Sequence, residues 1–260
     1  MTQKLFCIKL GGSVIADKTK PYTARKETIC ALARALKTVK TPMLISHGVG
    51  SFAHTSAQRY GGKKGYTSRW GIAKVSRDAQ EINRILIDIF LEEKLPVISF
   101  SPRAFLFTEQ AIMEKSFLCP LHEALSQKLI PVIHGDVIFD KAQKTTIFSG
   151  EKSLHLLIRY LRRNAFHVTD CIQLTNVDGV LDAKKKVIRE ITPKNWPQIR
   201  AHLQSMSVID VTGGMKHKVE EALLMTQFGI TTRIINGTTN DLSDLFGGDT
   251  TKGTLIHTNG

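Results

Sequence analysis

Two glycine-bearing turns that follow apolar strands are the segments of this sequence best suited to bind and position an anion. Residues 43–54 read Met-Leu-Ile-Ser-His-Gly-Val-Gly-Ser-Phe-Ala-His, and residues 6–13 read Phe-Cys-Ile-Lys-Leu-Gly-Gly-Ser. Backbone N–H groups at such strand-to-helix turns offer partial positive charge to a phosphate. Lys9 ends the first strand, where a mostly buried ammonium needs an anionic partner, and His54 stands four residues beyond its glycine turn. The pattern predicts two phosphate-binding loops that face one reaction centre.

Lys18 and His54 each allow a second interpretation. Lys18 lies a short loop beyond the first turn and could reach the same phosphates, or it could be a solvated lysine beside Asp17. His54 could be a core histidine, but its place near the first N–H groups of a helix favours contact with an anion. His47, on the strand itself, is expected to be structural.

A third anion site is predicted at residues 210–218, Asp-Val-Thr-Gly-Gly-Met-Lys-His-Lys, where two glycines open a helix and Lys218 projects from its second turn. Glu151 adds a carboxylate at another helix start, and Asp178 adds one at the tip of a strand-to-turn segment. Each segment alone could be a helix cap or a turn. Together they supply the lysines, glycine loops and few carboxylates that phosphoryl transfer requires, because its catalysis is mainly positioning and charge neutralisation.

Alternating strands and helices must position these groups. The expected strands are residues 4–10, 43–47, 96–100, 130–134, 137–140, 145–148, 171–176 and 231–236. The expected helices are residues 24–37, 76–93, 151–163, 194–204 and 214–227, followed by a short terminal helix, and residues 61–71 are expected to form a glycine-rich loop. The strands at 137–140 and 145–148 are expected to form a hairpin.

This alternation predicts an α/β fold, an αβα sandwich whose central sheet is mostly parallel and covered by helices on both faces. Ligands in such folds bind beyond the carboxyl ends of the strands, and both glycine turns lie at such ends. A fresh strand start at Cys171 suggests a boundary near residue 168, which divides the chain into lobes at 1–168 and 169–260.

Composition is ordinary for a soluble globular protein: 260 residues, 29.0 kDa and 42% hydrophobic residues. No apolar run approaches the roughly 18–20 residues that span a membrane, and the first residues lack a signal-peptide core. The four cysteines are scattered without a CxxC pair, so we expect reduced, mostly buried thiols and a cytoplasmic protein. They are Cys7, Cys30, Cys119 and Cys171.

The formal charge of +13 leaves two interpretations open. One is a nucleic-acid binder; the other is a solvated basic surface with a pocket for polyanionic small molecules. The basic residues are dispersed, in clusters such as 159–163 and 184–186, and no aromatic RNA-binding run joins them. We therefore favour the small-molecule interpretation and expect no nucleic-acid partner, with a catalytically silent sensor of phosphorylated metabolites as a further alternative.

Four motifs then make the chain resemble the amino acid kinase superfamily, because residues 8–13, 47–54, 174–180 and 211–219 occur in that superfamily's order. The second histidine of the glycine turn, His54, makes the chain similar to isopentenyl phosphate kinases. The resemblance covers essentially the whole chain, including Lys9 to Lys18 and residues 253–256 near the end.

The resemblance implies an amino-acid-kinase-like sandwich that transfers a phosphate from ATP to isopentenyl monophosphate, with Mg²⁺ accompanying the nucleotide. It implies an acceptor site in the first lobe, a nucleotide site in the second, and a homodimer; it identifies no metal ligand. The implied catalytic residues are Lys9, Lys18, His54 and Lys218. The acceptor phosphate would contact Val49, Gly50, His54 and Gly150. The ATP side would use Lys9, Gly11, Gly12, Ser13, Gly50, Thr175, Asp178, Gly214 and Lys218.

The chain departs from the family pattern at three positions. Val49 and Ala53 replace glycines, and a β-branched residue at position 49 would be strained by about 1–2 kcal/mol if its φ were positive. Lys152 replaces the second of two aspartates, which leaves Glu151 as the remaining carboxylate. These departures keep another small phosphate or phosphonate, such as fosfomycin, as an alternative acceptor.

The apolar tail of the acceptor would lie against the long helix at 76–93. Ile82, Leu86 and Ile89 or their neighbours are candidates for this contact, although for each of the three taken singly we favour a place in the plain core.

Overall fold

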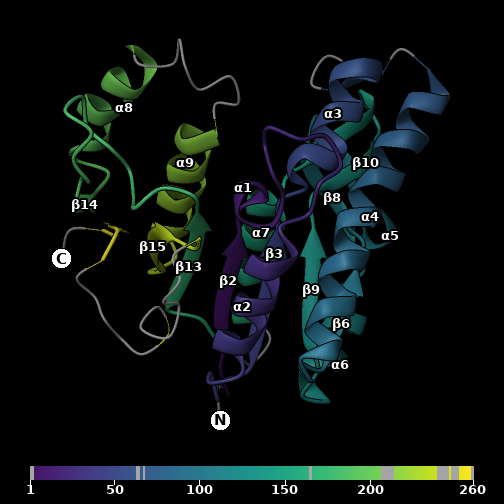
Figure 1. Cartoon of the computed structure of the whole chain (residues 1–260), viewed down its shortest axis with the longest axis horizontal. Helices are drawn as coiled ribbons and strands as arrows, with labels where there is room; N and C mark the ends of the chain where they lie inside the picture. The colour runs from purple at the N-terminus through teal and green to yellow at the C-terminus, as the bar shows by residue number, and fades with distance from the viewer. Residues whose placement is uncertain are drawn as a thin grey trace.

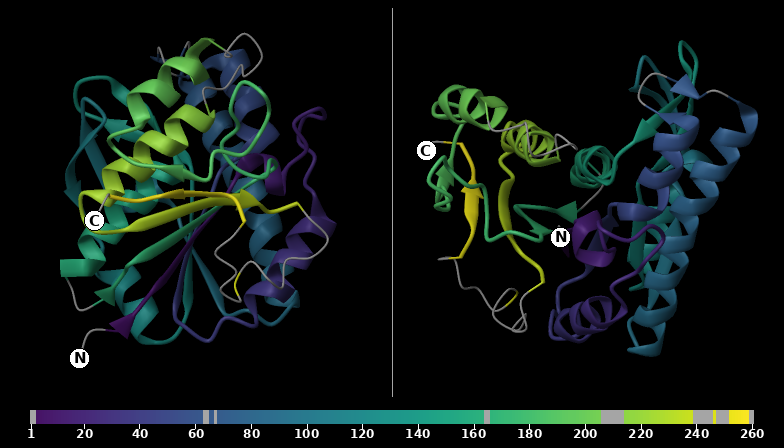
Figure 2. Two further views of the ribbon diagram at one scale, coloured as in Figure 1. Left: turned by 90° about the vertical axis from the view of Figure 1, so that its left-hand side faces the viewer. Right: turned by 45° about the horizontal axis from the view of Figure 1, so that its top comes forward.

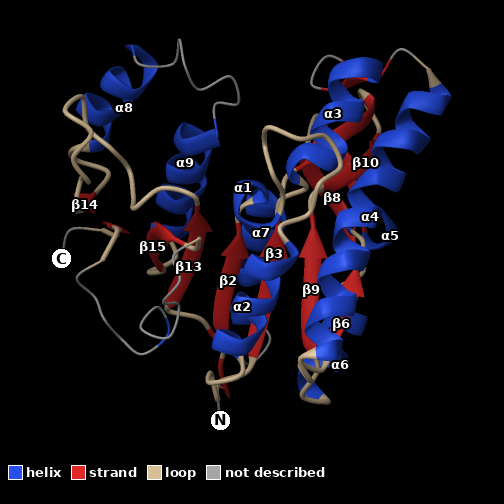
Figure 3. Ribbon diagram, in the orientation of Figure 1, coloured by secondary structure: helices blue, strands red, loops and turns tan. Residues whose placement is uncertain are grey.

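The computed structural model of the chain describes residues 3–62, 65–66, 68–163, 166–205, 214–238, 246 and 252–258. Strands of one large sheet run through the centre of the molecule, with helices on both sides (Figure 1 and Figure 3). In spatial order they are β14 (Glu190–Ile191), β16 (Thr254–Ile256), β15 (Thr231–Asn236), β13 (Asp170–Thr175), β2 (Phe6–Leu10), β3 (Met43–His47), β9 (Ile130–His134) and β6 (Val97–Phe100). Neighbouring strands are parallel except for the antiparallel pair β15–β16, which confirms the mostly parallel α/β sheet.

Both faces of this sheet are buried, and successive residues alternate between them. In β2, Cys7 points to one core cluster and Ile8 to the other; in β3, Leu44 and Ile45 are divided in the same way. Since side chains two residues apart share a face, Lys9 points to the side of Cys7.

The helices cover the two faces separately. The Ile8 face is covered by α1 (Gly12–Ile15), α2 (Lys26–Leu36) and α4 (Arg69–Glu92), and the Cys7 face by α6 (Cys119–Ser126), α7 (Gly150–Arg163), α8 (Trp196–Ser205) and α9 (Gly214–Thr226). Helix α3 (Gly50–Tyr60) packs along α4, and the two lie side by side in Figure 2. A short helix, α5 (Pro102–Phe105), packs against the first strand of the hairpin that follows β9.

A smaller sheet lies beside the central one, in the order β11 (Lys144–Phe148), β10 (Asp136–Asp140), β7 (Leu106–Glu109) and β8 (Ile112–Ser116). Strands β10 and β11 form the expected hairpin. The buried Asp140 carboxylate accepts N–H groups from Gln110, Ala111, Ala142 and Gln143, so it joins the turns of both hairpins. Although desolvation alone would raise it, these bonds lower the pKa of Asp140 to about 2.

Two expectations about local structure are wrong. Helix α4 begins at Arg69 rather than near residue 76, because Ser68 caps it by accepting the Gly71 N–H at 3.1 Å. Part of the expected loop at 61–71 forms paired strands, β4 (Gly61–Gly62) and β5 (Gly65–Tyr66).

Two further short strands, β1 (Gln3–Lys4) and β12 (Phe166–His167), pair in parallel. The expected short terminal helix after residue 236 would fall on residues 239–245 and 247–251, which lie outside the described residues, and the last described element is the strand β16. The cysteines are free, but only Cys7 and Cys171 are buried; Cys30 is half-buried and Cys119 exposed, which corrects the expectation of mostly buried thiols.

Candidate active site

The two predicted glycine turns meet at the carboxyl ends of β2 and β3. A Cβ added to Gly12 would lie 2.6 Å from the Gly50 nitrogen, and one added to Gly48 would lie 2.8 Å from the Gly12 nitrogen. Gly50 also has φ +49, a conformation that side chains rarely adopt. Since no side chain fits between the turns, their backbones touch and form one surface, as the sequence predicted.

The next strand of the sheet, β13, joins the first turn to the predicted nucleotide side. The Gly11 N–H donates to the Leu174 carbonyl at 2.9 Å. Ser13 Oγ donates to Asn176 Oδ1 at 2.9 Å, immediately beyond the buried Thr175 at the end of β13. The turn of α1 is therefore fixed against β13.

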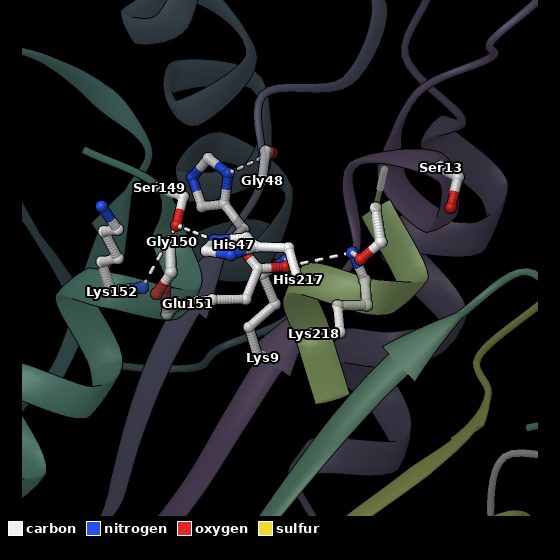
Figure 4. Close-up of polar contacts among 12 residues, drawn as sticks. Lys9, Ser13, His47, Gly48, Ser149, Gly150, Glu151, Lys152, His217 and Lys218 are labelled. Atoms are coloured by element: carbon white, nitrogen blue, oxygen red, sulfur yellow. Dashed lines mark hydrogen bonds and ion pairs between the residues drawn. The ribbon is translucent and has the colours of Figure 1, made fainter. Parts of the chain in front are cut away.

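A carboxylate flanked by two lysines lies beside these turns (Figure 4). Lys9 Nζ donates to Glu151 Oε1, and Lys218 Nζ lies 3.0 Å from the same oxygen. Lys9 is 1% exposed and Glu151 6%, so the pair is removed from water. Three elements supply this cluster: β2, the first turn of α7 and the second turn of α9.

The charges of this cluster depend on one another. Burial, opposed by the Glu151 carboxylate, lowers the pKa of Lys9 to about 8. Although burial alone would raise it, Lys9 and Lys218 hold the pKa of Glu151 well below its usual range. The carboxylate therefore stays ionised at neutral pH and orients both ammonium groups toward the turns.

The start of α7 is fixed by contacts that bring Glu151 to this place. Ser46 Oγ donates to the Gly150 carbonyl at 2.8 Å, and a Cβ on Gly150 would lie 2.6 Å from the His47 carbonyl. Only a glycine allows the helix to start this close to β3. The N-terminal position also suits the Glu151 carboxylate, because the helix dipole favours negative charge there.

His54 lies on α3 and its side chain is exposed. Partial desolvation by the surrounding protein, and then the positive charges of Lys18 and Lys218, lower the pKa of His54. Because this pKa lies below 6.5, the neutral form of the imidazole predominates at pH 7 in the free protein.

Lys18 is exposed on a loop, and Tyr22 of the same loop packs against helices α3 and α4. The Tyr22 ring packs edge-on against Phe52, with ring centres 5.9 Å apart, and Lys74 Nζ lies 5.1 Å from its centre. Tyr22 adopts φ 54, which is unusual for a bulky residue. These contacts determine where the Lys18 loop crosses α3 and α4; no feature of the sequence pattern indicated them.

Two of the three departures from the family pattern cause no strain. Val49 caps α3 with φ −95, so the β-branched side chain is compatible with its backbone. Ala53 is buried in a small apolar cluster with Val75, Ala79 and Val137, which we call the tail wall. Lys152, the third, points away from the Lys9–Glu151 pair in Figure 4, and its backbone N–H donates to Ser149 Oγ at 3.2 Å.

The structure supports the core alternative for Ile82 and Leu86. Both are fully buried in the large core cluster between α4, α2 and the sheet, and Ile89 packs on the same cluster. The tail wall lies nearer the N-terminus of α4 and beside Val49, at the glycine turn. The apolar side chains next to the turn are thus smaller than those the sequence suggested, and they too are buried.

Beyond β13, Asp178 is exposed and accepts a hydrogen bond from Asn236 Nδ2 at 2.9 Å. Gly214 starts α9, while residues 206–213, which hold the rest of the third predicted anion site, lie outside the described residues. His217 Nε2 lies 3.1 Å from Ser149 Oγ and joins α9 to α7 beside Lys218.

Sequence reasoning did not identify Ser46, Asn176 or His217 as part of this site. A serine in the apolar strand Met-Leu-Ile-Ser-His was the available signal for Ser46.

Within the described ranges, no group of three or more His, Cys, Asp or Glu side chains is arranged to hold a metal ion. Glu151, the carboxylate nearest the turns, is already engaged by two ammonium groups. These side chains fit an ion carried by phosphate oxygens better than a protein-held one. None of the described helices combines the length and apolar composition needed to cross a bilayer.

Comparison with known proteins agrees with this geometry. Residues 4–236 match the amino acid kinase family. The isopentenyl phosphate kinase of Methanocaldococcus jannaschii is 31% identical over 231 residues, covering 83% of this chain and 85% of that protein, and the one of Haloferax volcanii is 30% identical, covering 85% and 88%. A solved isopentenyl phosphate kinase superposes with a TM-score of 0.79 at 24% identity, covering 97% of this chain and 99% of its own. A product complex of the Thermoplasma acidophilum kinase gives 0.78 at 24% identity, covering 97% and 100%. The chain belongs to the amino acid kinase family and, within it, to the isopentenyl phosphate kinases.

Proposed function

We propose that this protein transfers the γ-phosphate of ATP to isopentenyl monophosphate and forms the diphosphate, a step of isoprenoid biosynthesis. The observation that carries the proposal is the single carboxylate, Glu151, that orients Lys9 and Lys218 beside two touching glycine turns. The relatives that share most of the chain are isopentenyl phosphate kinases.

In this proposal the transferring phosphate lies against the N–H groups of the first turn, residues 11–13, with Lys9 and Lys218 neutralising the charge that shifts toward ADP. Glu151 holds the two ammonium groups in place and takes no proton, since an acceptor phosphate is already ionised at pH 7. The protein therefore needs no general base. Mg²⁺ would accompany ATP on its phosphate oxygens.

The acceptor phosphate would lie against the second turn, at Val49 and Gly50, near Gly150. His54 and Lys18 would approach it from α3 and from the loop above. A neutral imidazole suits this role because its N–H can donate to an anion without a prior proton uptake. Thr175, Asp178 and Gly214 would line the ATP side, so residues 1–168 would bind the acceptor and residues 169–260 the nucleotide.

The test is ADP release with isopentenyl phosphate, dimethylallyl phosphate, fosfomycin and UMP as acceptors. We expect turnover with the first two and little with the others. Turnover of fosfomycin alone would reassign the acceptor to a phosphonate. Binding of ATP and acceptor without ADP release would indicate a silent sensor, and steeply salt-dependent RNA binding that survives Lys9→Met would favour a nucleic-acid role.

A homodimer in the cytoplasm completes the proposal. Ile98 on the edge strand β6 and Leu91 on the adjoining α4 are exposed apolar residues at one side of the sheet. Light scattering of the purified protein would decide between one copy and two.

A further inference from the structure

A buried apolar cluster begins beside the place proposed for the acceptor phosphate and has a polar side chain packed on it. The tail wall (Ala53, Val75, Ala79 and Val137) is contributed by α3, α4 and β10, and Val49 at the glycine turn packs against it. Tyr66 on β5 packs against the same cluster. A chain attached to a phosphate at Gly50 would therefore follow apolar side chains until it reached Tyr66.

Tyr66 contributes more than its ring. Its hydroxyl is buried and has no hydrogen-bond partner. Burial, and then the negative charge of Asp136, raise the pKa of Tyr66 well above its ordinary value, so the hydroxyl keeps its proton. It can therefore both donate and accept a hydrogen bond.

His134, at the end of β9, has unused hydrogen-bonding capacity close to the same carboxylate. The side chain is 1% exposed and stacks on His47, with ring centres 5.7 Å apart and planes inclined by 22°. Both ring nitrogens are buried without a partner, and Nε2 lies 3.5 Å from Asp136 Oδ2, too far for a good hydrogen bond. Buried polar groups are normally paired, so the Tyr66 hydroxyl and the His134 Nδ1, which both belong to side chains influenced by or close to Asp136, require an explanation.

Asp136 cannot supply the missing bonds, because other groups hold it. Ser101 Oγ donates to it at 3.0 Å, the Val137 N–H at 2.7 Å, and Arg103 forms an ion pair with it. Arg103 is held in turn by Ser76 Oγ at 2.7 Å. A carboxylate and a guanidinium side by side disfavour both an anionic and a cationic guest, which leaves a neutral donor–acceptor group, a hydroxyl.

We propose that Tyr66 and His134 form the far end of the acceptor site and bind a hydroxyl group at the end of the acceptor's carbon chain. The acceptors would then include hydroxylated C5 alkyl monophosphates, beside the plain alkenyl compound. The inference rests on the proposed function, since an acceptor phosphate at the glycine turn is what directs the chain along the tail wall. With a plain alkenyl phosphate, water would take the place of the hydroxyl.

The experiment compares two C5 monophosphates that differ only in a terminal hydroxyl, with kcat/KM measured for each. The ratio of hydroxylated to plain compound is taken in the wild type, in Tyr66→Phe and in Tyr160→Phe. Tyr160→Phe is the matched control, because it removes the same atom from α7 on the opposite face of the sheet. A site that bonds a substrate hydroxyl discriminates strongly once the partner is lost, so we expect the ratio to fall about tenfold in Tyr66→Phe and to stay unchanged in Tyr160→Phe.

Calorimetric binding of both compounds to the wild type gives a measurement that needs no variant, and the hydroxylated compound should bind at least as tightly as the plain one. An equal ratio in all three proteins, or binding of the plain compound alone, would mean that water fills this place and would overturn the inference while leaving the proposed function intact. Turnover of neither compound would overturn both.

Discussion

The two faces of the central sheet treat polar groups differently where they meet the proposed site. On the α7–α9 face, the buried Lys9 and Glu151 and the partly exposed Lys218 are paired with one another. On the α4 face, the tail wall is apolar, and Tyr66 and His134 keep unpaired hydrogen-bonding atoms. The first arrangement is complete before a substrate arrives, as the stabilisation of a transferring phosphate requires. The second is incomplete, and an incomplete set of bonds is what allows a site to select its ligand.

Removing the Glu151 carboxylate, which Lys9 and Lys218 share, should have the largest effect, a loss of folding stability. Glu151→Gln leaves the buried Lys9 ammonium and the partly exposed Lys218 ammonium without their counter-ion, and breaking a buried pair costs about 3–5 kcal/mol of stability. Urea unfolding at pH 7 measures this loss. The double variant Lys9→Met/Glu151→Gln should recover part of it, because one buried charge is removed; the same stability in both variants would contradict the ion-pair account.

The direction in which folding stability changes with pH follows from the same carboxylate. The pKa of Glu151 is lowered from 4.5 in the folded protein, so the unfolded chain takes up the proton first on acidification. The stabilisation is therefore complete at neutral pH and is lost as the pH falls below 4.5.

Either lysine proposed to be catalytic, Lys9 or Lys218, should matter more to turnover than to acceptor binding. Lys9→Met and Lys218→Met keep most of the side-chain volume and remove the charge that stabilises the shifting phosphate. We expect kcat to fall about 10²–10³-fold, as when one transition-state donor is lost, with little change in the KM of the acceptor. Lys184→Met, on an exposed turn, is the matched control. Wild-type kcat in either variant would exclude that lysine from the reaction.

His54 should contribute less and should act on the acceptor. His54→Ala removes a donor to a charged phosphate, which costs about 1.5–3 kcal/mol in kcat/KM, and His54→Gln should retain part of it. Because the imidazole is already neutral in the free protein, its contribution should not change between pH 7 and 8. Kinetics of the three proteins across that range provide the test, and unchanged kcat/KM in the alanine variant would make the histidine purely structural.

Alkaline pH should lower kcat/KM through the charged cluster of Lys9, Glu151 and Lys218, and not through the tail wall. Lys9 must be protonated to act, and burial lowers its pKa to about 8 in the free protein. Above that pH, kcat/KM should fall by about tenfold per unit, whereas a lysine at its ordinary pKa of about 10.4 would leave it level. Lys9→Arg should abolish this alkaline limb, since a guanidinium stays charged. If kcat/KM still fell above pH 8 in the arginine variant, the decrease would have to come from another titrating group.

Much of the site could be predicted because its groups lie at strand ends and helix starts, which local patterns mark. The strands ending at Leu10 and His47 and the helix starting at Gly150 are examples. Which carboxylate meets which lysine could not be predicted from spacing, since Lys9 and Glu151 are 142 residues apart and only the folded sheet brings them together.

The unpredicted elements share physical causes. Strand β8 is exposed along its whole length, so it shows no apolar alternation, and α6 has only eight residues. On α4, the spacing of apolar residues identified the buried face of the helix. It did not show at which helical turn that face stops packing on the large core cluster and packs in the tail wall instead. The sequence pattern indicated the large residues Ile82 and Leu86 as candidates for the tail contact, whereas the tail wall contains the smaller Val75 and Ala79.

Restoring the family's glycine at position 49 should have the smallest effect. Val49 has φ −95 and ψ −5, which a β-branched residue adopts without strain, and its side chain packs against both the core and the tail wall. Val49→Gly therefore relieves nothing, removes apolar contacts and loosens the unfolded chain, so stability should fall by about 1 kcal/mol. The N–H that would face the acceptor phosphate is retained, and kcat/KM with isopentenyl phosphate should change by no more than about twofold. A more than tenfold gain in kcat/KM for a longer or bulkier acceptor would instead show that the valine narrows the entrance to the tail wall. The α4 face would then select the acceptor by its size as well as by its hydrogen bonds.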